Sequence, residues 1–268
     1  MASQGVFISD VDHTLLGDPN GTQQFAKEFA RYRPRFRLVY ASGRFCKSVW
    51  QSIREHGLPA PDGVIGGVGT EIELGGRRLT DWPPADPGWD PVRVRSALDV
   101  HPDLEIQPAE FLSSHKISYT GRRLSLEALA GIDQRLQRSG LHCDLIYSSN
   151  RDLDVLPRGI DKGNAALRLA AEWNVAPSQL LVAGDSGNDL ALFRVACRGI
   201  VVANACDELR RLAECPASTS SRPHVYLAQQ PFAAGVVAGL QYFSGGEPPD
   251  HSDCNESGST CKSWQALR

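Results

Sequence analysis

Short apolar segments that end at a polar residue recur along this chain, and they constrain its fold more than any other feature. Helix-length stretches lie between them. Buried strands that alternate with helices predict a parallel sheet covered on both faces. We therefore expect a doubly wound, mostly parallel α/β core. The expected strands are 6–8, 38–41, 64–65, 180–183 and 200–203, and the expected helices are 23–31, 45–56, 162–173 and 190–196.

The middle of the chain has a different character. It opens with a proline-rich stretch at 82–87, and expected helices then alternate with strands of alternating polarity. This order predicts an α+β module inserted into the core. The expected domains are a core formed by 1–81 and 158–243 and an inserted cap at 82–157.

Composition excludes several classes of function. The net charge of −3 lacks the basic excess of a nucleic-acid binder. No apolar run approaches the roughly 18–20 residues of a membrane helix, and residues 1–7 do not resemble a signal peptide. The irregularly spaced cysteines are typical of reduced thiols, so we expect a cytoplasmic protein. The polar stretch 244–268, which contains Cys254 and Cys261, is predicted to be a disordered tail; these two cysteines could also pair or bind a metal.

Asp10 and Asp12 follow the first expected strand. Residues two apart in an extended chain point to the same side, so we expect both carboxylates at one point beyond the sheet. Two such acids repel each other unless a cation lies between them or one stays protonated, and oxygen ligands suit Mg²⁺. Such an acid could attack phosphorus, and its neighbour could transfer protons. The alternative is a surface turn in which an Asp caps the backbone.

Ser42, Gly43 and Arg44 lie where the second expected strand passes into a helix. A hydroxyl, a glycine that allows close approach and exposed helix N–H groups predict a phosphate cradle, to which Arg44 could add charge. An ordinary helix N-cap is the alternative.

Two later motifs are also candidates for functional residues. Lys162 opens a helix, where a cation opposes the helix dipole, and such a local conflict often marks a functional residue; a solvated lysine is the alternative. Asp185, Asn188 and Asp189 lie in a glycine-rich turn after the strand 180–183. Their acid density exceeds what a bare turn needs, and it predicts hard oxygen ligands for a metal.

The order of these motifs resembles the haloacid dehalogenase superfamily, and the insertion between the serine and lysine motifs resembles its C2B type of cap. The resemblance implies a phosphatase in which Asp10 is the nucleophile and Asp12 the general acid and base. The implied phosphate-binding residues are Ser42, Gly43, Arg44, Lys162 and Asn188, and the implied Mg²⁺ residues are Asp10, Asp12 and Asp185, with Asp189 supporting them from behind.

Several segments also resemble sucrose-6-phosphate phosphatases, over about residues 5–243. These segments are 66–72, 115–119, 147–149, 152–157 and 233–235, and two of them, 66–70 and 147–149, are also similar to mannosylfructose-phosphate phosphatase. The resemblance implies hydrolysis of sucrose 6-phosphate, with mannosylfructose phosphate or another sugar or polyol phosphate as alternatives. A non-enzymatic alternative is a regulatory partner of a sucrose-phosphate synthase. Such domains often lose an acid of the first pair, whereas both acids are present here.

Three polar residues are candidates to bind the sugar: Glu71, Lys116 and Asp152. Polar side chains that face a catalytic mouth suit sugar hydroxyls, which need both donors and acceptors. The alternative is that these residues are solvated surface charges.

Overall fold

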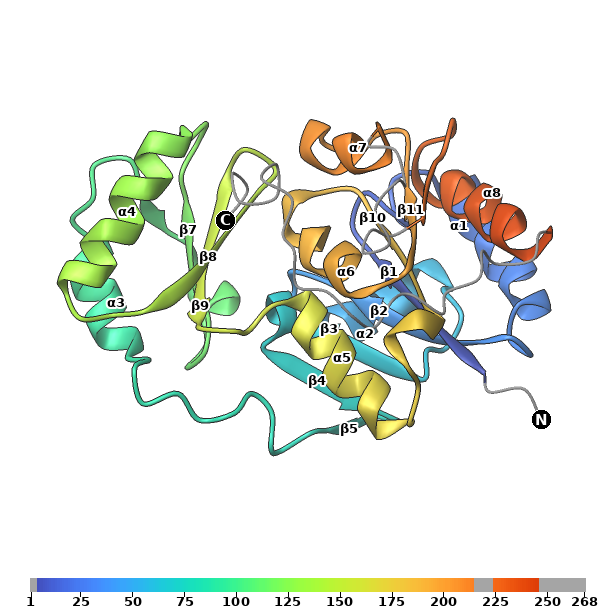
Figure 1. Cartoon of the computed structure of the whole chain (residues 1–268), viewed down its shortest axis with the longest axis horizontal. Coiled ribbons are helices and arrows are strands. Elements are labelled where there is room, and N and C mark those ends of the chain that lie inside the picture. The colour runs from blue at the N-terminus through green and yellow to red at the C-terminus, as the bar shows by residue number, and fades with distance from the viewer. Residues whose placement is uncertain (1–3, 215–223, 246–268) are drawn as a thin grey trace.

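The computed structural model describes residues 4–214 and 224–245, which form two sheets with helices packed around them (Figure 1). The larger sheet has eight strands in the order β12-β11-β10-β1-β2-β3-β4-β5. Its pairs are parallel from β12 to β3 and antiparallel from β3 to β5. Its strands are β1 (Gly5–Asp10), β2 (Phe36–Ala41), β3 (Gly63–Gly66), β4 (Glu71–Leu74), β5 (Arg77–Arg78), β10 (Leu180–Gly184), β11 (Arg198–Val201) and β12 (His224–Leu227).

Both faces of the large sheet are covered. The consecutive residues Val6, Phe7 and Ile8 of the central strand β1 are all fully buried, as expected for a strand with helices on both sides. Helix α1 packs against α8, and α5 packs against α6. The helices are α1 (Pro19–Glu28), α2 (Cys46–His56), α5 (Lys162–Glu172), α6 (Leu190–Val195), α7 (Asp207–Glu214) and α8 (Phe232–Gly245), with short 3-10 turns η1 (Phe29–Arg31), η2 (Gly67–Gly69), η4 (Pro177–Gln179) and η5 (Gly187–Asp189). The doubly wound, mostly parallel core is thus confirmed.

The second sheet is antiparallel, with the strand order β6-β7-β9-β8. Together with α3 and α4, it is called the cap below. Helices α3 and α4 cover the side of this sheet that points away from the core (Figure 1). The cap elements are α3 (Pro91–Leu98), β6 (Glu105–Ile106), η3 (Ala109–Phe111), β7 (Ile117–Thr120), α4 (Leu126–Arg138), β8 (Cys143–Ser148) and β9 (Asp152–Pro157).

Alternation along the cap strands separates an apolar face from a polar face. Ile117 and Tyr119 of β7 and Leu153 and Val155 of β9 pack with α3 and α4 in the core of the cap. Because successive strand residues point to opposite sides, the residues between them face the other way, toward the large sheet. This face, called the polar face below, presents Ser118, Asp152 and Asp154 beside the apolar Leu156.

The sequence-based expectations differ from the structure at several element boundaries. The first helix begins at Pro19, four residues before the expected 23, because Asp18 caps its N-terminus by accepting from the backbone N–H groups of Asn20 and Gly21. Strand β11 ends at Val201, whereas 200–203 was expected. Helix α8 continues to Gly245, and the remainder of the predicted tail, with Cys254 and Cys261, lies outside the described residues. The boundaries expected for the domains stay a prediction.

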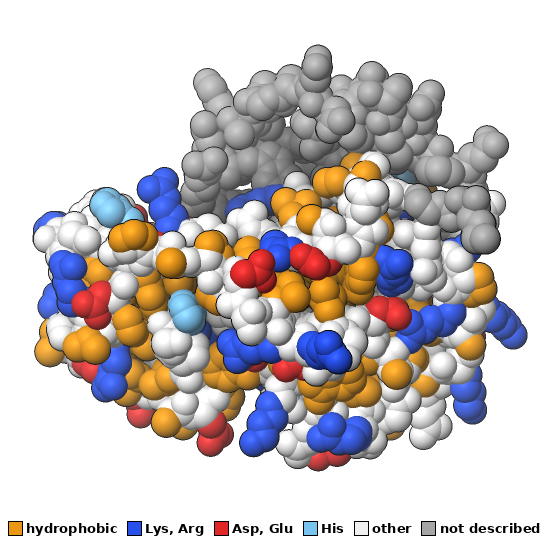
Figure 2. All heavy atoms as spheres, turned by 90° about the horizontal axis from the view of Figure 1, so that it is seen from below, with side chains coloured by type: hydrophobic (Ala, Val, Ile, Leu, Met, Phe, Trp, Pro, Cys, Tyr) orange, Lys and Arg blue, Asp and Glu red, His pale blue; other side chains and the backbone are white. Residues whose placement is uncertain are grey.

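The surface carries charges of both signs. Figure 2 shows basic and acidic side chains interspersed with apolar ones over the face seen from below. Among the described residues, no helix combines the length and the apolar character needed to cross a bilayer.

Candidate active site

The carboxyl ends of β1, β2 and β10 bring the predicted motifs together. Asp10 ends β1 and pairs in register with Ala41 of β2, so Ser42 follows directly beside it. On the other side, Ser9 pairs with Ala183 of β10, which places Asp185 just past the same edge. Parallel strands end at a common edge of the sheet, and ligands of doubly wound folds bind there. Residues far apart in sequence therefore meet at one point.

Lys162 lies at the centre of this edge and is fully buried. Its ammonium group donates to Oδ1 of Asp10 at 2.7 Å, to Oδ1 of Asn188 at 2.6 Å and to Oδ1 of Asp189 at 2.7 Å. All three N–H donors are thus used. Burial acts to lower the pKa of Lys162, but the ion pairs with Asp10 and Asp189 outweigh it and leave the pKa raised. The lysine stays charged.

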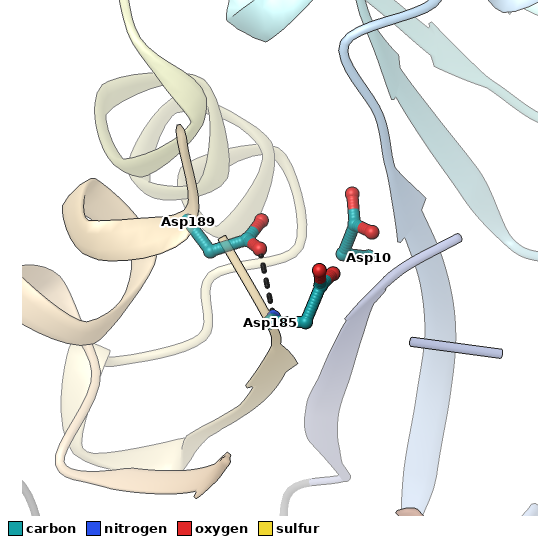
Figure 3. Close-up of side chains that lie close together, drawn as sticks. All are labelled: Asp10, Asp185 and Asp189. Carbon is teal, nitrogen blue, oxygen red and sulfur yellow. Dashed lines mark hydrogen bonds between the residues drawn. The ribbon is translucent and has the colours of Figure 1, made fainter. Parts of the chain in front are cut away.

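Asp10, Asp185 and Asp189 form a compact acidic cluster, drawn in Figure 3. One carboxylate oxygen from each lies within 4.8 Å of the others. Asp189 holds the turn together, because its Oδ2 accepts from the backbone N–H groups of Asp185 at 3.0 Å and Ser186 at 3.1 Å. Thr14 donates to Oδ1 of Asp185 at 2.8 Å. These hard oxygen donors are of the kind that Mg²⁺ prefers.

The electrostatics of the cluster favour an added cation or proton. Burial raises the pKa of Asp10 well above its usual value, Lys162 lowers it, and Asp189 and Asp185 raise it further. Burial and the neighbouring Asp189 likewise raise the pKa of Asp185 to about 7. Bringing these acids together in a buried place therefore costs free energy that a bound Mg²⁺ would offset.

Asp12 lies apart from that cluster. Its Oδ2 accepts from Nε of Arg44 at 2.8 Å and from Oγ of Ser42 at 3.3 Å. The Asp12 side chain keeps 44% of its surface exposed, and Arg44 is anchored in turn by donating to Oγ of Ser52 at 2.8 Å. Arg44, which we expected to bind phosphate, is therefore engaged with Asp12, whose carboxylate remains accessible.

A cavity of about 490 Å³ opens above these residues, between the core and the cap. Gly43 contributes to its floor: a Cβ placed there would lie 3.6 Å from Nδ2 of Asn188. The core lines the cavity with Asp10, Asp12, His13, Gly43, Arg44, Asp185, Ser186 and Asn188, and the cap lines it with Gln107, Pro108, Phe111, Lys116, Thr120, Arg122, Ser148, Ser149, Arg151, Asp152 and Asp154. A phosphate near Asp10 would thus leave the rest of a substrate facing the cap.

A family comparison covers nearly the whole described chain. The model of the sucrose-6F-phosphate phosphohydrolase family matches residues 3–244, which include both the core and the cap. The chain belongs to this family. Its architecture is the haloacid dehalogenase fold: a subclass IIB sugar phosphatase of that superfamily, 14% identical, covers 90% of this chain and 99% of its own with a TM-score of 0.64.

Individual members of the sucrose-6F-phosphate phosphohydrolase family and its relatives resemble this chain to a similar degree. Sucrose-phosphatase 1 of Nicotiana tabacum is 32% identical over 94% of this chain, which spans 64% of the tobacco protein. Mannosylfructose-phosphate phosphatase of Agrobacterium fabrum is 31% identical over 88% of this chain and 95% of its own length. The sucrose-phosphatase of Synechocystis sp. PCC6803, solved with sucrose and phosphate, has a TM-score of 0.81 and 30% identity over 90% of this chain and 98% of its own.

In this chain, the cap residue Lys116 lines the cavity, although only 3% of its surface is exposed. Its ammonium donates to Oδ1 of Asp154 at 2.8 Å and to Oγ of Ser118 at 2.5 Å. It also lies 5.4 Å from the ring centroid of Phe45, a core residue. Lys116 therefore links Ser118 and Asp154 on the cap and contacts Phe45 of the core.

Asp152 also lines the cavity, whereas Glu71 does not. Asp152 accepts from Nε2 of Gln107 at 2.9 Å and pairs with Arg151. Glu71 accepts from the backbone N–H of Cys46 at 2.9 Å, at the start of α2, and pairs with Arg78. The structure thus brings two of the three sugar-binding candidates to the cavity and places Glu71 at a helix N-terminus.

Several residues of the site were missed in the sequence. Thr14, Gln107, Arg122 and Asp154 touch the acidic cluster or line the cavity. For Asp154 a signal was present: polar Asp152 and Asp154 alternate with apolar Leu153 and Val155, so they share the face opposite the cap core. Thr14 and Gln107 lie in loops, where no periodicity indicates direction.

Proposed function

We propose that this protein is a Mg²⁺-dependent phosphatase that hydrolyses a disaccharide phosphate, with sucrose 6-phosphate as the first candidate. One observation carries the proposal. The carboxylate of Asp10, buried beside Asp185 and 2.7 Å from the Lys162 ammonium, lies at the floor of a cavity whose roof is the polar face of the cap. Membership of the sucrose-6F-phosphate phosphohydrolase family supports the class of substrate.

The proposed reaction has two steps. Asp10 attacks phosphorus, and the bond between phosphorus and the sugar oxygen breaks while Asp12 gives that oxygen a proton. Asp12 then takes a proton from a water molecule, whose oxygen attacks the aspartyl phosphate and releases phosphate and free Asp10. The contact of Asp12 with Nε of Arg44 orients its carboxylate toward the cavity. Asp12 is thus accessible to the leaving oxygen and to water.

The transferring group carries negative charge that the site must neutralise. Lys162 supplies a permanent positive charge next to Asp10, and Gly43 and Asn188, which line the cavity, offer close backbone approach and an amide. Ser42 is buried and donates to Asp12, and its hydroxyl is proposed to turn to the phosphoryl group when substrate is bound. Mg²⁺ held by Asp10 and Asp185, with Asp12 as the third expected ligand, would add charge that stabilises the phosphoryl oxygens. Because both oxygens of Asp189 are bound to Lys162 and to backbone N–H groups, we assign Asp189 to holding these ligands in place.

The cap is proposed to recognise the sugar through polar side chains that line the cavity. A cavity of about 490 Å³ lies within the roughly 300–1,000 Å³ range of small-molecule sites. Asp152 and Lys116 are proposed to pair with sugar hydroxyls, since both residues line the cavity. A sugar hydroxyl left without a partner would be penalised in this enclosed space.

Mannosylfructose phosphate is the second candidate substrate. The Agrobacterium fabrum relative matches over 95% of its own length, which supports it independently of the plant sequences. A purely regulatory role beside a sucrose-phosphate synthase is disfavoured, because Asp10 and Asp12 are both present and both line the cavity.

The test is phosphate release by the purified full chain from a panel of sugar phosphates, with Mg²⁺ and after exhaustive chelation. We expect sucrose 6-phosphate to give the highest kcat/KM and chelation to abolish turnover. A higher kcat/KM for mannosylfructose phosphate would change the substrate. Full activity after chelation would contradict the metal assignment, and Ca²⁺ should substitute poorly because it prefers more ligands at longer distances.

A further inference from the structure

Gly187 lies in the acidic turn between Ser186 and Asn188, and strand β8 of the cap packs directly against it. A Cβ at Gly187 would lie 2.6 Å from the backbone oxygen of Tyr147, 3.7 Å from the backbone carbon of the same residue and 3.8 Å from Cα of Ser148. These three nearest atoms all belong to β8 of the cap. The space that a side chain would need is therefore occupied by the cap and not by the turn itself.

The conformation of Gly187 does not explain why a glycine is present. Gly187 begins the 3-10 turn η5, and it is not one of the glycines with positive φ. Other residue types adopt such backbone angles without strain. The opposing atom is a backbone carbonyl oxygen, which cannot rotate away as a side chain would. The approach of β8 is thus the feature that a side chain at this position would disturb.

The contact lies next to residues that line the cavity and are proposed to bind the substrate. Ser186 and Asn188, on either side of Gly187, line the cavity, as do Ser148 and Ser149 at the end of β8. On the β7 side of the cap, Lys116 touches the ring of Phe45, the residue that follows Arg44. The cap therefore meets the core at both segments proposed to bind phosphate, and β8 contacts Gly187 where the two walls of the cavity come together.

We propose that Gly187 is a positioning residue: its missing side chain lets the sugar-facing wall at β8 approach the phosphate site closely enough to discriminate large sugar phosphates from small esters. This inference rests on the proposed function. A Cβ would hold β8 away, so the hydroxyl contacts of a disaccharide would weaken while a small phosphate ester, which reaches only the core, would be bound as before.

The experiment compares Gly187→Ala and Gly187→Ser with the unaltered full chain in Mg²⁺. We expect kcat/KM for sucrose 6-phosphate to fall about ten- to a hundredfold, because its hydroxyls lose their partners on the cap, and kcat/KM for the small ester methyl phosphate to change less than about threefold. Gly131→Ala is the matched control, because a Cβ there meets nothing within 4 Å; it should leave both substrates unchanged.

A second measurement does not depend on any substrate. Hydrogen exchange of the backbone amides in 145–151 should speed up in Gly187→Ala and stay unchanged in Gly131→Ala, because β8 loses its contact with the core. Equal loss on both substrates, or unchanged kinetics and exchange, would overturn the inference. If the unaltered protein released no phosphate, the proposed function would fail, whereas the exchange comparison would still decide whether Gly187 holds β8 against the core.

Discussion

The ammonium group of Lys162 and the carboxylate of Asp10 lie 2.7 Å apart, both almost completely buried, although 152 residues separate them. The pair spans the insertion, because Asp10 precedes the cap in sequence and Lys162 follows it. A buried charge without its partner is strongly unfavourable, so this contact joins the two parts of the core that the cap separates. The proposed nucleophile is thereby bound to a permanent cation.

The first prediction concerns this nucleophile. Asp10→Asn keeps the size of the side chain but removes the charge that would attack phosphorus, so we expect nearly all turnover to be lost. The fold should remain, because Lys162 keeps its ion pair with Asp189. Phosphate release measured alongside near-ultraviolet circular dichroism checks both statements. Substantial turnover by a well-folded variant would rule out the aspartyl-phosphate route.

The second prediction concerns Thr14, which donates to Asp185. Thr14→Val has nearly the same shape but loses the hydroxyl, so Asp185 would be less well oriented. Loss of such a supporting contact typically weakens metal binding about ten- to a hundredfold. Isothermal titration calorimetry with Mg²⁺ measures the change. Thr22→Val is the control, because the hydroxyl of Thr22 is also buried but donates to Leu15 and Asp18; equal Mg²⁺ affinities in the two variants would contradict the role of Thr14.

The third prediction concerns pH in the absence of Mg²⁺. The pKa of Asp185 is raised from 3.8 to about 7 in the folded protein, so between these values the folded state binds more protons than the unfolded state. The contribution of Asp185 to the free energy of unfolding is therefore lost as pH rises from about 4 to about 7. Asp185→Asn removes this dependence.

Calorimetric melting in a chelator checks the pH effect. At pH 8 we expect the Tm of Asp185→Asn to exceed that of the unaltered protein by at least about 2 °C, and the difference should shrink toward pH 4. Added Mg²⁺ should stabilise the unaltered protein by binding its folded state and have little effect on the variant. A lower Tm for Asp185→Asn in chelator at pH 8 would refute the electrostatic account.

The fourth prediction concerns recognition by the cap. Removing a polar partner leaves a sugar hydroxyl unpaired at a cost of about 1–3 kcal/mol, so Asp152→Ala or Lys116→Ala should lower kcat/KM for sucrose 6-phosphate about ten- to a hundredfold. A small generic ester should be hydrolysed as before. Asp133→Ala, on the cap helix α4, is the control and should leave both substrates unaffected.

The two cap variants will differ in stability. Lys116→Ala strands the buried Asp154, and removing one partner of such a pair is strongly destabilising, so its kinetics must be measured below its own Tm. Parallel loss on both substrates would mean that these residues support the fold or the chemistry. No loss on either would place the sugar contacts elsewhere and favour another ester.

The sequence predicted the placement of the core motifs well because parallel strands leave little freedom. Once Asp10, Ser42 and Asp185 were assigned to strand ends, the common edge of a parallel sheet brought them together. The short strands β5 and β6 were not predicted, since two residues carry no periodicity.

Side-chain partners were predicted less well than positions. Arg44 lines the cavity as predicted, but its pairing with Asp12 was not foreseen, and its role toward phosphate stays a prediction. Glu71 does not line the cavity and accepts from a backbone N–H at the start of α2. Each outcome depends on which of several nearby charges a long side chain reaches. That choice is made by tertiary packing, which spacing along the chain does not specify.

The alternation of the cap strands β7 and β9 has a consequence for protein engineering. Thr120 and Asp152 line the cavity from the polar face, while Ile117 and Val155 belong to the cap core. A library that varies only such polar positions, and keeps the buried pair of Lys116 and Asp154, would reshape the chamber without removing apolar surface from the interior. New substrate preferences could then be selected at little expense in folding yield, whereas randomising the intervening positions would mainly recover unfolded chains.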